Sequence, residues 1–406
     1  MRRSMALLTI VLAALVLVVT ASTPVAVAQD NTITYVPASS IEHPEDIGVR
    51  AHTNIIVKIH PDNTSPCGSK CETPASMACV YRVVSPLVPG CPITTTTTNP
   101  SGGVGAIALV DAYDNPDAVA DMTAYTSEFG IPAPTFSVVF ATGTRPPNNP
   151  GGWSLEEALD IEMAAATAPK AQIFLVEAAS NSFADLYQAE QVAGNMVAAA
   201  GGGVVSNSWG GGEYTGQQKD EKTYFSTPGV VYFASTGDSG INVVSVPSTF
   251  AAVVAAGGTH ISRNSSGNFV GESWWSGGGG GSSAIEARPS YQNGISSIVG
   301  SNRGVPDISA DADPNTGPAM YDADGGFFWF QVGGTSVASP YLAGTVNSAG
   351  KLRKSSFAEL GAIYSEYANA TQYKAWYRDI TTGGSECKVG WDFCTGVGSP
   401  VHYFGK

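Results

Sequence analysis

The chain has few charged residues, and basic ones are especially scarce. Charged side chains make up 13% of its 406 residues, with 20 lysines and arginines against 34 aspartates and glutamates, and the formal net charge is −14. A surface with so little positive charge cannot neutralise phosphates, which argues against nucleic acid or an anionic membrane as a partner. The composition suits an acidic habitat, where many carboxylates are neutral and repel one another less.

Long apolar runs are absent after the first 28 residues. Arg2 and Arg3 precede an almost wholly apolar stretch over residues 7–19, and an Ala-x-Ala pattern ends at Ala28. This order is typical of a cleaved secretory signal peptide, and an uncleaved membrane anchor is the alternative. No later stretch reaches the ~20 apolar residues that a membrane span needs. We therefore expect a secreted, extracellular protein with no membrane contact in its mature form.

Cysteine is also rare, and its six positions fall into two groups. They are Cys67, Cys71, Cys79 and Cys91 in the first group and Cys387 and Cys394 in the second. An even count in an exported chain favours disulfides, and the last two would close a short loop. The first four can pair in three ways, and the sequence does not choose. A zinc site is the alternative for these four, although their spacings of 4, 8 and 12 lack the paired C-x-x-C form.

The rest of the chain divides into a polar N-terminal part and a long region of alternating strands and helices. Residues 29–77 form an N-terminal extension or a short propeptide, and residues 78–406 form the main domain, with a low-complexity stretch over 92–103. Apolar runs predict strands over 104–111, 136–141, 172–177, 204–206, 230–235 and 252–256, and periodic segments predict helices over 115–129, 155–168 and 183–200. This alternation indicates an α/β fold, with a mostly parallel sheet covered by helices on both faces. In such folds the active site lies beyond the carboxyl ends of the strands.

Histidine is scarce as well, and this matters because of one serine. Residues 333–340, GGTSVASP, predict a glycine turn that places Ser336 in the first turn of a helix, near unpaired backbone N–H groups. A serine hydroxyl needs a neighbouring base to become a good nucleophile. Of the five histidines, three lie in the N-terminal extension and His402 lies near the C-terminus. His260 follows a predicted strand, and we expect it to be an ordinary packed or solvated residue at the strand end. A Ser-His-Asp triad is therefore poorly supported.

Carboxyl groups offer an alternative base. At the start of the helix predicted over 155–168, Ser154 can cap the N-terminus and Glu157 can complete a capping box. Glu156 and Asp160 stand four residues apart on one face, so their like charges raise the pKa of one carboxyl and favour a short acid–acid hydrogen bond. The simpler interpretation is a solvated acidic face. The apolar residues that follow argue against it, because they indicate a mostly buried helix.

Asp238 is a third candidate carboxyl. It ends the stretch VVYFASTG, at the carboxyl edge of the predicted sheet, in the sequence GDSG. A turn-forming aspartate is the simpler interpretation. A protonated carboxyl in a dry site could instead donate a hydrogen bond to an oxyanion.

Together these motifs resemble those of the sedolisins, or serine-carboxyl peptidases, and the resemblance covers roughly residues 78–401. The matching stretches, in order, are Glu156-x-x-x-Asp160, Ser206–Gly210, Gly237-Asp238-Ser239-Gly240, the glycine run 277–281, residues 306–314 and Gly334-Thr335-Ser336-x-x-x-Pro340. The resemblance implies a subtilisin-like fold in which a glutamate replaces the histidine. It implies Ser336 as nucleophile, Glu156 as general base, Asp160 as its partner and Asp238 in the oxyanion hole. Ser208, Trp209 and Gly210 would bind the substrate backbone.

The same resemblance implies a calcium loop near the C-terminus, in the stretches 379–381 and 390–392. Calcium prefers hard oxygen ligands. The implied ligands are the carboxylates of Asp379 and Asp392 and the carbonyls of Ile380, Lys388 and Gly390. A lysine stands at 388 where the family usually has glycine, and a disulfide between the last two cysteines would clamp the loop. An ordinary turn with two acids is the alternative.

We therefore expect a secreted serine-type endopeptidase, a monomer that hydrolyses protein or peptide substrates at acidic pH through a Ser-Glu-Asp triad and an acyl-enzyme. One alternative is a conventional subtilisin-type peptidase that uses Asp111 and a histidine. The other is a catalytically inactive binding or adhesion domain with the sedolisin fold. Sedolisins are commonly made with a long folded propeptide, so the role of residues 29–77 stays open, as does the side-chain preference at the cleavage site.

Overall fold

The computed structural model describes residues 31–403, so the predicted signal peptide over residues 1–28 lies outside the described part. The chain from Thr32 onward forms one compact unit. Helix α1, Pro74–Val80, crosses the expected boundary between extension and main domain at residue 78, and that boundary stays a prediction. Within the described residues, no helix is long and apolar enough to cross a membrane.

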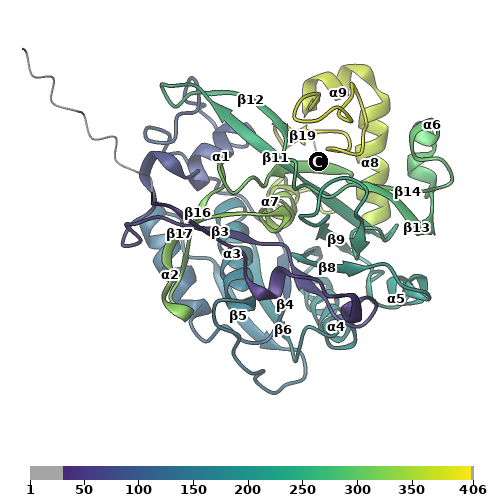
Figure 1. Ribbon diagram of the computed structural model, residues 1–406, viewed down its shortest axis with the longest axis horizontal. Coiled ribbons are helices and arrows are strands. Elements are labelled where there is room, and N and C mark those ends of the chain that lie inside the picture. The colour runs from purple at the N-terminus through teal and green to yellow at the C-terminus, as the bar shows by residue number, and fades with distance from the viewer. Residues whose placement is uncertain (1–30, 404–406) are drawn as a thin grey trace, which may run out of the picture. The chain divides into compact units, whose positions relative to one another are not determined.

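A mostly parallel sheet, of eight strands within the described residues, forms the centre of this unit (Figure 1). Its order is β12-β11-β9-β7-β4-β6-β5, with β15 also paired to β11, and β12 alone runs antiparallel to its neighbour. The strands are β4 (Ala106–Ala112), β5 (Thr135–Phe140), β6 (Gln172–Ala178), β7 (Gly203–Asn207), β9 (Val230–Ser235), β11 (Val253–Arg263), β12 (Phe269–Trp274) and β15 (Ile308–Asp311). The predicted α/β class and the six predicted strands are confirmed, although β11 continues well past its expected end.

Helices cover both faces of the sheet, because its strands point alternate side chains into two apolar cores. In β4, Ile107 and Leu109 belong to one core and Ala108 and Val110 to the other. The first core includes residues of α2 (Ala118–Phe129), α3 (Trp153–Thr167), α7 (Thr335–Ser348) and α8 (Ser356–Ala368). The second includes residues of α4 (Phe183–Ala199), and Tyr224 of α5 (Gln217–Tyr224) packs against it. The shorter helices α6 (Ser296–Val299) and α9 (Ala370–Trp376) lie later in the chain.

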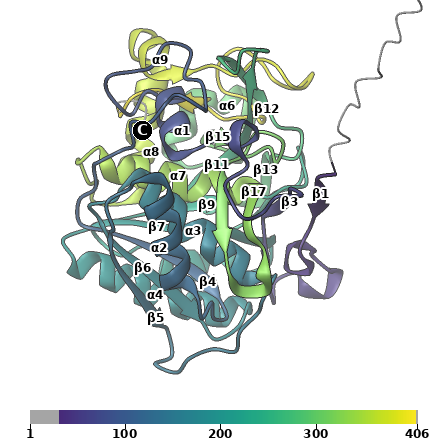
Figure 2. The same ribbon diagram turned by 90° about the vertical axis from the view of Figure 1, so that its left-hand side faces the viewer.

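The N-terminal segment adds strands to two smaller sheets. β1 (Ile33–Tyr35) pairs with β3 (Ile56–Ile59), which pairs with β17 (Phe328–Gly333), and β17 pairs with β16 (Ala319–Asp322) (Figure 2). β2 (His52–Thr53) pairs with β8 (Trp209–Gly212), which also pairs with β10 (Ser245–Val246). Two further pairs are β13 (Gly281–Ala287) with β14 (Asn302–Val305) and β18 (Tyr377–Arg378) with β19 (Ser399–Pro400). The N-terminal segment is thus built into the unit beside β17, the strand that leads to Ser336.

The six cysteines form three disulfides. They are Cys67–Cys71, Cys79–Cys91 and Cys387–Cys394. The expected pairing of the last two is confirmed, and one of the three possible pairings of the first four is selected. The zinc alternative is wrong, because the described residues include no free cysteine to supply a thiolate.

The start of α3 differs from the prediction. Gly152 is the N-cap, and Ser154 lies inside the helix, where its hydroxyl accepts a hydrogen bond from the Gly151 N–H at 3.1 Å. Asn149 Oδ1 accepts from the Trp153 N–H at 2.9 Å instead. The predicted capping box of Ser154 and Glu157 is therefore wrong, because a turn that begins at Asn149 supplies the first acceptor.

α3 and α7 pack closely at a glycine. All of α3 is buried, and so is α7 apart from its last residue. A Cβ added to Gly344 of α7 would lie 2.9 Å from Thr167 Cβ of α3 and closer still to its hydroxyl oxygen. The missing side chain therefore lets the helix that carries Ser336 approach the helix that carries Glu156 and Asp160.

Gly344→Ala should destabilise the fold by about 1–3 kcal/mol, because the added methyl forces two buried helices apart. Urea unfolding measures this loss of unfolding free energy. Gly361→Ala in α8 is the matched control, since a Cβ at that position would meet no atom within 4 Å and alanine favours helix. Equal stability of the two variants would contradict the close helix contact.

Candidate active site

Ser336 lies in the first turn of α7, directly after a tight turn. Gly334 joins β17 to the helix. Its φ of +104° is a backbone conformation that residues with a side chain rarely adopt. Ser336 is fully buried, and its Oγ donates to the Ser208 carbonyl oxygen at 3.0 Å. The structure thus places the predicted nucleophile at a helix N-terminus, beside the end of β7.

α3 brings Glu156 and Asp160 to the same place. Both carboxyls are fully buried. The Ser208 hydroxyl donates to Asp160 Oδ1 at 2.6 Å and lies 3.2 Å from the Ser336 carbonyl oxygen, so Ser208 connects the acid helix to the serine helix. Neither Glu156 oxygen nor Asp160 Oδ2 makes a hydrogen bond of normal geometry. The expected acid–acid hydrogen bond stays a prediction.

Burial raises the pKa of Glu156 well above its ordinary value, and the nearby Asp111 and Asp238 raise it further, whereas the Ser336 hydroxyl and the Asn54 backbone lower it. The pKa of Asp160 is also raised well above the ordinary value, first by burial and then by Asp111 and Glu156. These side chains therefore form one electrostatic group in which ionising one carboxyl disfavours ionising the next.

Asp238 follows β9 and faces the same turn. Its Oδ1 accepts hydrogen bonds from the Thr335 N–H at 2.8 Å and from the Thr335 hydroxyl at 2.9 Å. Its Oδ2 is buried and has no partner. Burial raises the pKa of Asp238 to about 7, so below that pH Oδ2 carries a proton that it can donate.

Two residues next to the catalytic candidates were not assigned to the Ser-Glu-Asp site from the sequence, where Asp111 was named only in the alternative with a histidine base. Asp111 is the second-last residue of β4, is fully buried, and has no hydrogen bond at either oxygen; burial raises its pKa to about 8. Its position at the carboxyl end of a buried strand was an available signal. Thr335 was quoted in the serine motif, but only the structure shows that it holds Asp238.

The histidines do not take the place of a catalytic base. His260 lies on β11 with its Nδ1 2.9 Å from Asp313 Oδ2. His52 lies on β2, and its Nδ1 is 3.1 Å from the Thr53 carbonyl oxygen. The groups that shift the pKa of Glu156 are two carboxyls, one hydroxyl and one backbone N–H, with no imidazole among them.

The predicted substrate-backbone stretch, Ser208 to Gly210, is paired with the N-terminal segment. His52 lies opposite Gly210 and Thr53 opposite Trp209 in an antiparallel pair. The Trp209 indole donates to the Val110 carbonyl oxygen at 2.9 Å, which fixes this strand to β4. Local sequence patterns cannot predict contacts between residues that are so far apart in the sequence.

The predicted calcium loop is compact. The Gly390 N–H donates to Asp379 Oδ2 at 3.0 Å, and Asp392 accepts from the Lys388 and Cys394 N–H groups at 2.6 and 3.0 Å. Burial raises the pKa of Asp392 to about 6, and the neighbouring Asp379 contributes to the rise. Two mutually repelling carboxylates on one loop are a donor set that fits a hard cation.

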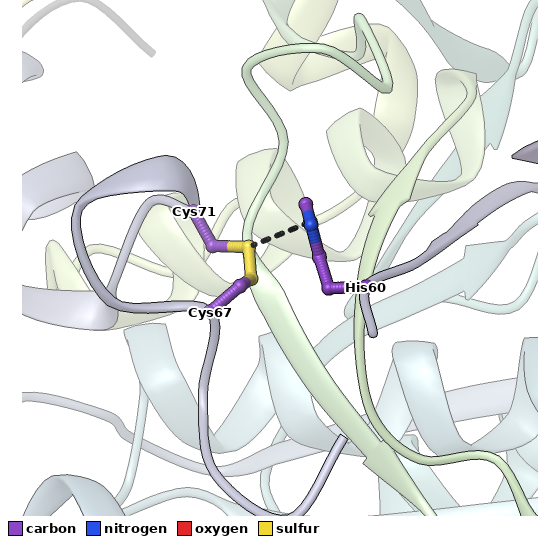
Figure 3. Close-up of side chains that lie close together, drawn as sticks. All are labelled: His60, Cys67 and Cys71. Atoms are coloured by element: carbon purple, nitrogen blue, oxygen red, sulfur yellow. Dashed lines mark hydrogen bonds between the residues drawn. A yellow bond between two sulfur atoms is a disulfide. The ribbon is translucent and has the colours of Figure 1, made fainter. Parts of the chain in front are cut away.

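A histidine also lies beside a disulfide. Figure 3 shows His60 with its Nε2 3.9 Å from the sulfur of Cys71, which is bonded to Cys67. Although these three residues lie close enough together for a metal site, a disulfide offers no thiolate ligand. We assign no metal to this cluster.

A comparison with protein-family models finds no match. Among curated proteins, kumamolisin of Bacillus sp. strain MN-32 is 30% identical over 339 residues, covering 73% of this chain and 58% of kumamolisin. Sedolisin of Pseudomonas sp. strain 101 is 29% identical over 202 residues, covering 42% of this chain and 33% of sedolisin. The chain therefore spans between a third and three fifths of the length of these relatives.

Solved structures show the same fold. Pseudomonas sedolisin, described as a serine-carboxyl proteinase complexed with two molecules of pseudo-iodotyrostatin, matches with a TM-score of 0.66 at 22% identity, over 82% of this chain and 96% of that chain. An S41 psychrophilic protease matches with a TM-score of 0.53 at 18% identity, over 82% of this chain and 99% of its own. At these identities the likeness concerns the fold, and it confirms the predicted subtilisin-like arrangement.

Stability should fall as the pH rises from about 4 to about 8. The raised pKa values of Asp111 (about 8) and Asp238 (about 7) mean that these acids stay protonated in the folded state, whereas the unfolded chain ionises them above pH ~4. The unfolding free energy, measured by urea titration of a Ser336→Ala chain, should drop by several kcal/mol across this range, since one pKa unit is about 1.4 kcal/mol.

Asp111→Asn should flatten this pH dependence, because the amide does not ionise. The exposed Glu128→Gln is the control and should leave the slope unchanged. A chain that gains stability between pH 4 and pH 8 would contradict the raised pKa values.

Proposed function

We propose that the chain is a member of the sedolisin family and a serine-type endopeptidase of the serine-carboxyl class, because of its similarity to kumamolisin and sedolisin. The observation that carries the proposal is the meeting of Ser336, on α7, with the buried acids Glu156 and Asp160, on α3, next to the unpartnered Oδ2 of Asp238. A nucleophile, a base, an orienting acid and an oxyanion donor are the parts that acyl transfer needs.

The reaction begins when Glu156 takes the proton of Ser336 as its Oγ attacks the peptide carbonyl carbon. The Ser336 N–H and the protonated Asp238 stabilise the negative oxygen that develops. Glu156 then gives the proton to the departing amine, which leaves an ester between the substrate and Ser336. Water attacks this ester by the same sequence, and the free acid leaves. Asp160 acts on Glu156 through coupled ionisation, because the charge on one carboxyl of the pair disfavours loss of the proton from the other.

This machinery predicts acid activity. Asp238 must be protonated to donate, and its pKa of about 7 sets the upper limit of the working range. The low limit is set by Glu156, which must be able to accept a proton. We propose that activity is confined to acidic pH. This agrees with a composition that is rich in acidic residues and poor in basic ones.

Protein or peptide chains are the proposed substrates, bound through their backbone by Ser208, Trp209 and Gly210 as an added strand. With the signal peptide expected over residues 1–28, we propose a secreted, extracellular enzyme that acts as a monomer, without nucleic acid or membrane partners.

We further propose a structural calcium ion in the C-terminal loop, held by the carboxylates of Asp379 and Asp392 and by the carbonyls of Ile380, Lys388 and Gly390. When bound, the ion would supply positive charge that offsets the repulsion of the two carboxylates, and it would stabilise the loop that the Cys387–Cys394 disulfide closes. It takes no part in the reaction.

Digestion of an unfolded protein substrate across pH 3 to 8 tests the enzyme. The parent should be active at acidic pH and lose activity above about 7. Ser336→Ala and Glu156→Gln should lose at least ~10³-fold in kcat, and Asp238→Asn about 10²–10³-fold. Glu162→Gln is the control, because this buried acid of α3 accepts from the Tyr321 N–H and takes no part in the site.

An optimum above pH 7 that survives Glu156→Gln would favour a conventional histidine base. No digestion at any pH by the parent, with Ser336→Ala behaving alike, would favour a binding domain.

Calcium removal should lower the melting temperature of the folded chain, since a ligand that binds only the folded state stabilises it. Thermal unfolding with and without a chelator measures the shift. Asp392→Asn should remove the chelator effect, whereas the exposed Glu386→Gln in the same loop should keep it. An unchanged melting temperature on chelation would contradict the calcium site.

A further inference from the structure

Residues 51–54, which include β2, pass through the candidate active site with backbone hydrogen bonds on both edges. On one edge, His52 and Thr53 pair with β8. On the other edge, the Ala51 N–H donates to the Asn181 carbonyl oxygen at 2.8 Å, and the Asn181 side chain donates back to the Ala51 carbonyl oxygen at 2.8 Å. This is how a peptide substrate adds a strand to a sheet edge.

Asn54 ends this strand in register with Ser336. Its N–H donates to the Ser208 carbonyl oxygen at 3.3 Å, and its own carbonyl oxygen accepts from the Ser336 N–H at 3.2 Å. A Cβ built on Gly334 would overlap this carbonyl oxygen and would lie 2.7 Å from Asp238 Oδ2. The Asn54 carbonyl therefore points into the place where the Ser336 N–H and Asp238 would stabilise an oxyanion.

We propose that Ser336 cleaves the chain's own Asn54–Ile55 bond, and that the pocket around the Asn54 side chain selects asparagine on the N-terminal side of the cut. This inference rests on the proposed peptidase function. It adds the bond of this chain that is cut and the side chain that is preferred before the cut.

The pocket around the Asn54 side chain is small and polar. The side-chain amide donates to the Ser235 hydroxyl at 2.7 Å, and both residues are buried. Gly210 and Gly237 line the surroundings together with Ser245, whose hydroxyl oxygen would lie 2.8 and 3.7 Å from a Cβ built on these glycines. A buried hydroxyl that pairs with a substrate amide disfavours side chains that lack a donor, because it is then left unpaired.

The chemistry balances with water as the co-reactant. The Ser336 Oγ bonds to the Asn54 carbonyl carbon, and its proton passes to Glu156. The C–N bond to Ile55 then breaks, and Glu156 protonates the new Ile55 amine. Water hydrolyses the Asn54–Ser336 ester, giving a free Asn54 carboxyl group and regenerating the serine.

The fold allows residues 31–54, the arm that the cut would release, to leave. All six cysteines lie after residue 54, so no disulfide ties residues 31–54 to the rest of the chain. Hydrogen bonds hold the arm near the bond, where the Ser40 hydroxyl contacts the Ile55 carbonyl oxygen at 3.1 Å and the Thr53 hydroxyl at 2.8 Å. Until the arm leaves, Ala51 to Ile55 occupy the strand position that a substrate needs.

The first experiment follows the full chain at pH 4 by intact mass and N-terminal sequencing. The parent should acquire an N-terminus at Ile55, at a first-order rate that is independent of protein concentration over a 100-fold range. Ser336→Ala should keep the bond intact. Asn54→Leu should slow the cut at least tenfold, whereas Thr34→Leu, an exposed change in the same arm, should not.

The second experiment tests the pocket with synthetic peptides, using the parent after its cut. A peptide of the sequence VRAHTNIIVK, residues 49–58, should be cleaved after asparagine with kcat/KM about tenfold above that of the same peptide with alanine there, as the loss of one buried hydrogen bond predicts. Ser235→Ala should reduce this ratio toward one without changing the acid pH profile.

Digestion of an unfolded protein by the same samples separates the two proposals. A parent that digests this substrate but keeps the Asn54–Ile55 bond overturns self-cleavage and leaves the peptidase standing. Concentration-dependent cutting overturns cleavage within one chain, and equal rates on the asparagine and alanine peptides overturn the selective pocket. Loss of both digestion and self-cleavage overturns the peptidase as well.

Discussion

The contact between α3 and α7 is the constraint on which the rest of the site depends. Gly344, in the C-terminal half of α7, lacks the side chain that would clash with Thr167 at the end of α3, so the two helices can pack closely. Ser336 on α7 and Glu156 and Asp160 on α3 are completely buried. The short separation and the exclusion of water come from the same packing, and both are needed for a weak acid to act on a serine hydroxyl.

The carboxyls of Asp111, Glu156 and Asp238 have raised pKa values because they are buried without a cationic partner. Asp307 is a contrasting buried acid, because it accepts from Arg303 at 2.5 Å and both side chains are fully buried. Among the ion pairs of the described residues, none involves Asp111, Glu156 or Asp238. Such groups are costly to ionise, so they hold protons at pH values where exposed acids have lost them. The proposed acid activity, which needs a protonated Asp238, and the expected acid stability would then have one physical origin.

Much of the fold could be read from the sequence, because its strands are continuous apolar runs and its helices are periodic. A common site for Glu156, Asp160, Asp238 and Ser336 was predicted from the resemblance of their motifs to those of the sedolisins, together with the rule that active sites lie where parallel strands end. The cap of α3 was mispredicted, since the acceptor comes from Asn149, outside the expected helix. The pairing of residues 52–54 with β8 could not be foreseen, because it joins segments more than 150 residues apart through backbone groups that carry no sequence signal.

The claim that a neutral carboxyl stands beside the nucleophile can be measured directly. The carboxyl carbon of Asp238 in a ¹³C-aspartate-labelled Ser336→Ala chain, assigned by its loss in Asp238→Asn, should titrate in NMR with a pKa of about 7 and be protonated at pH 5. An Asp238 that is already ionised at pH 5 would contradict the account, because it could not then donate a hydrogen bond to the oxyanion.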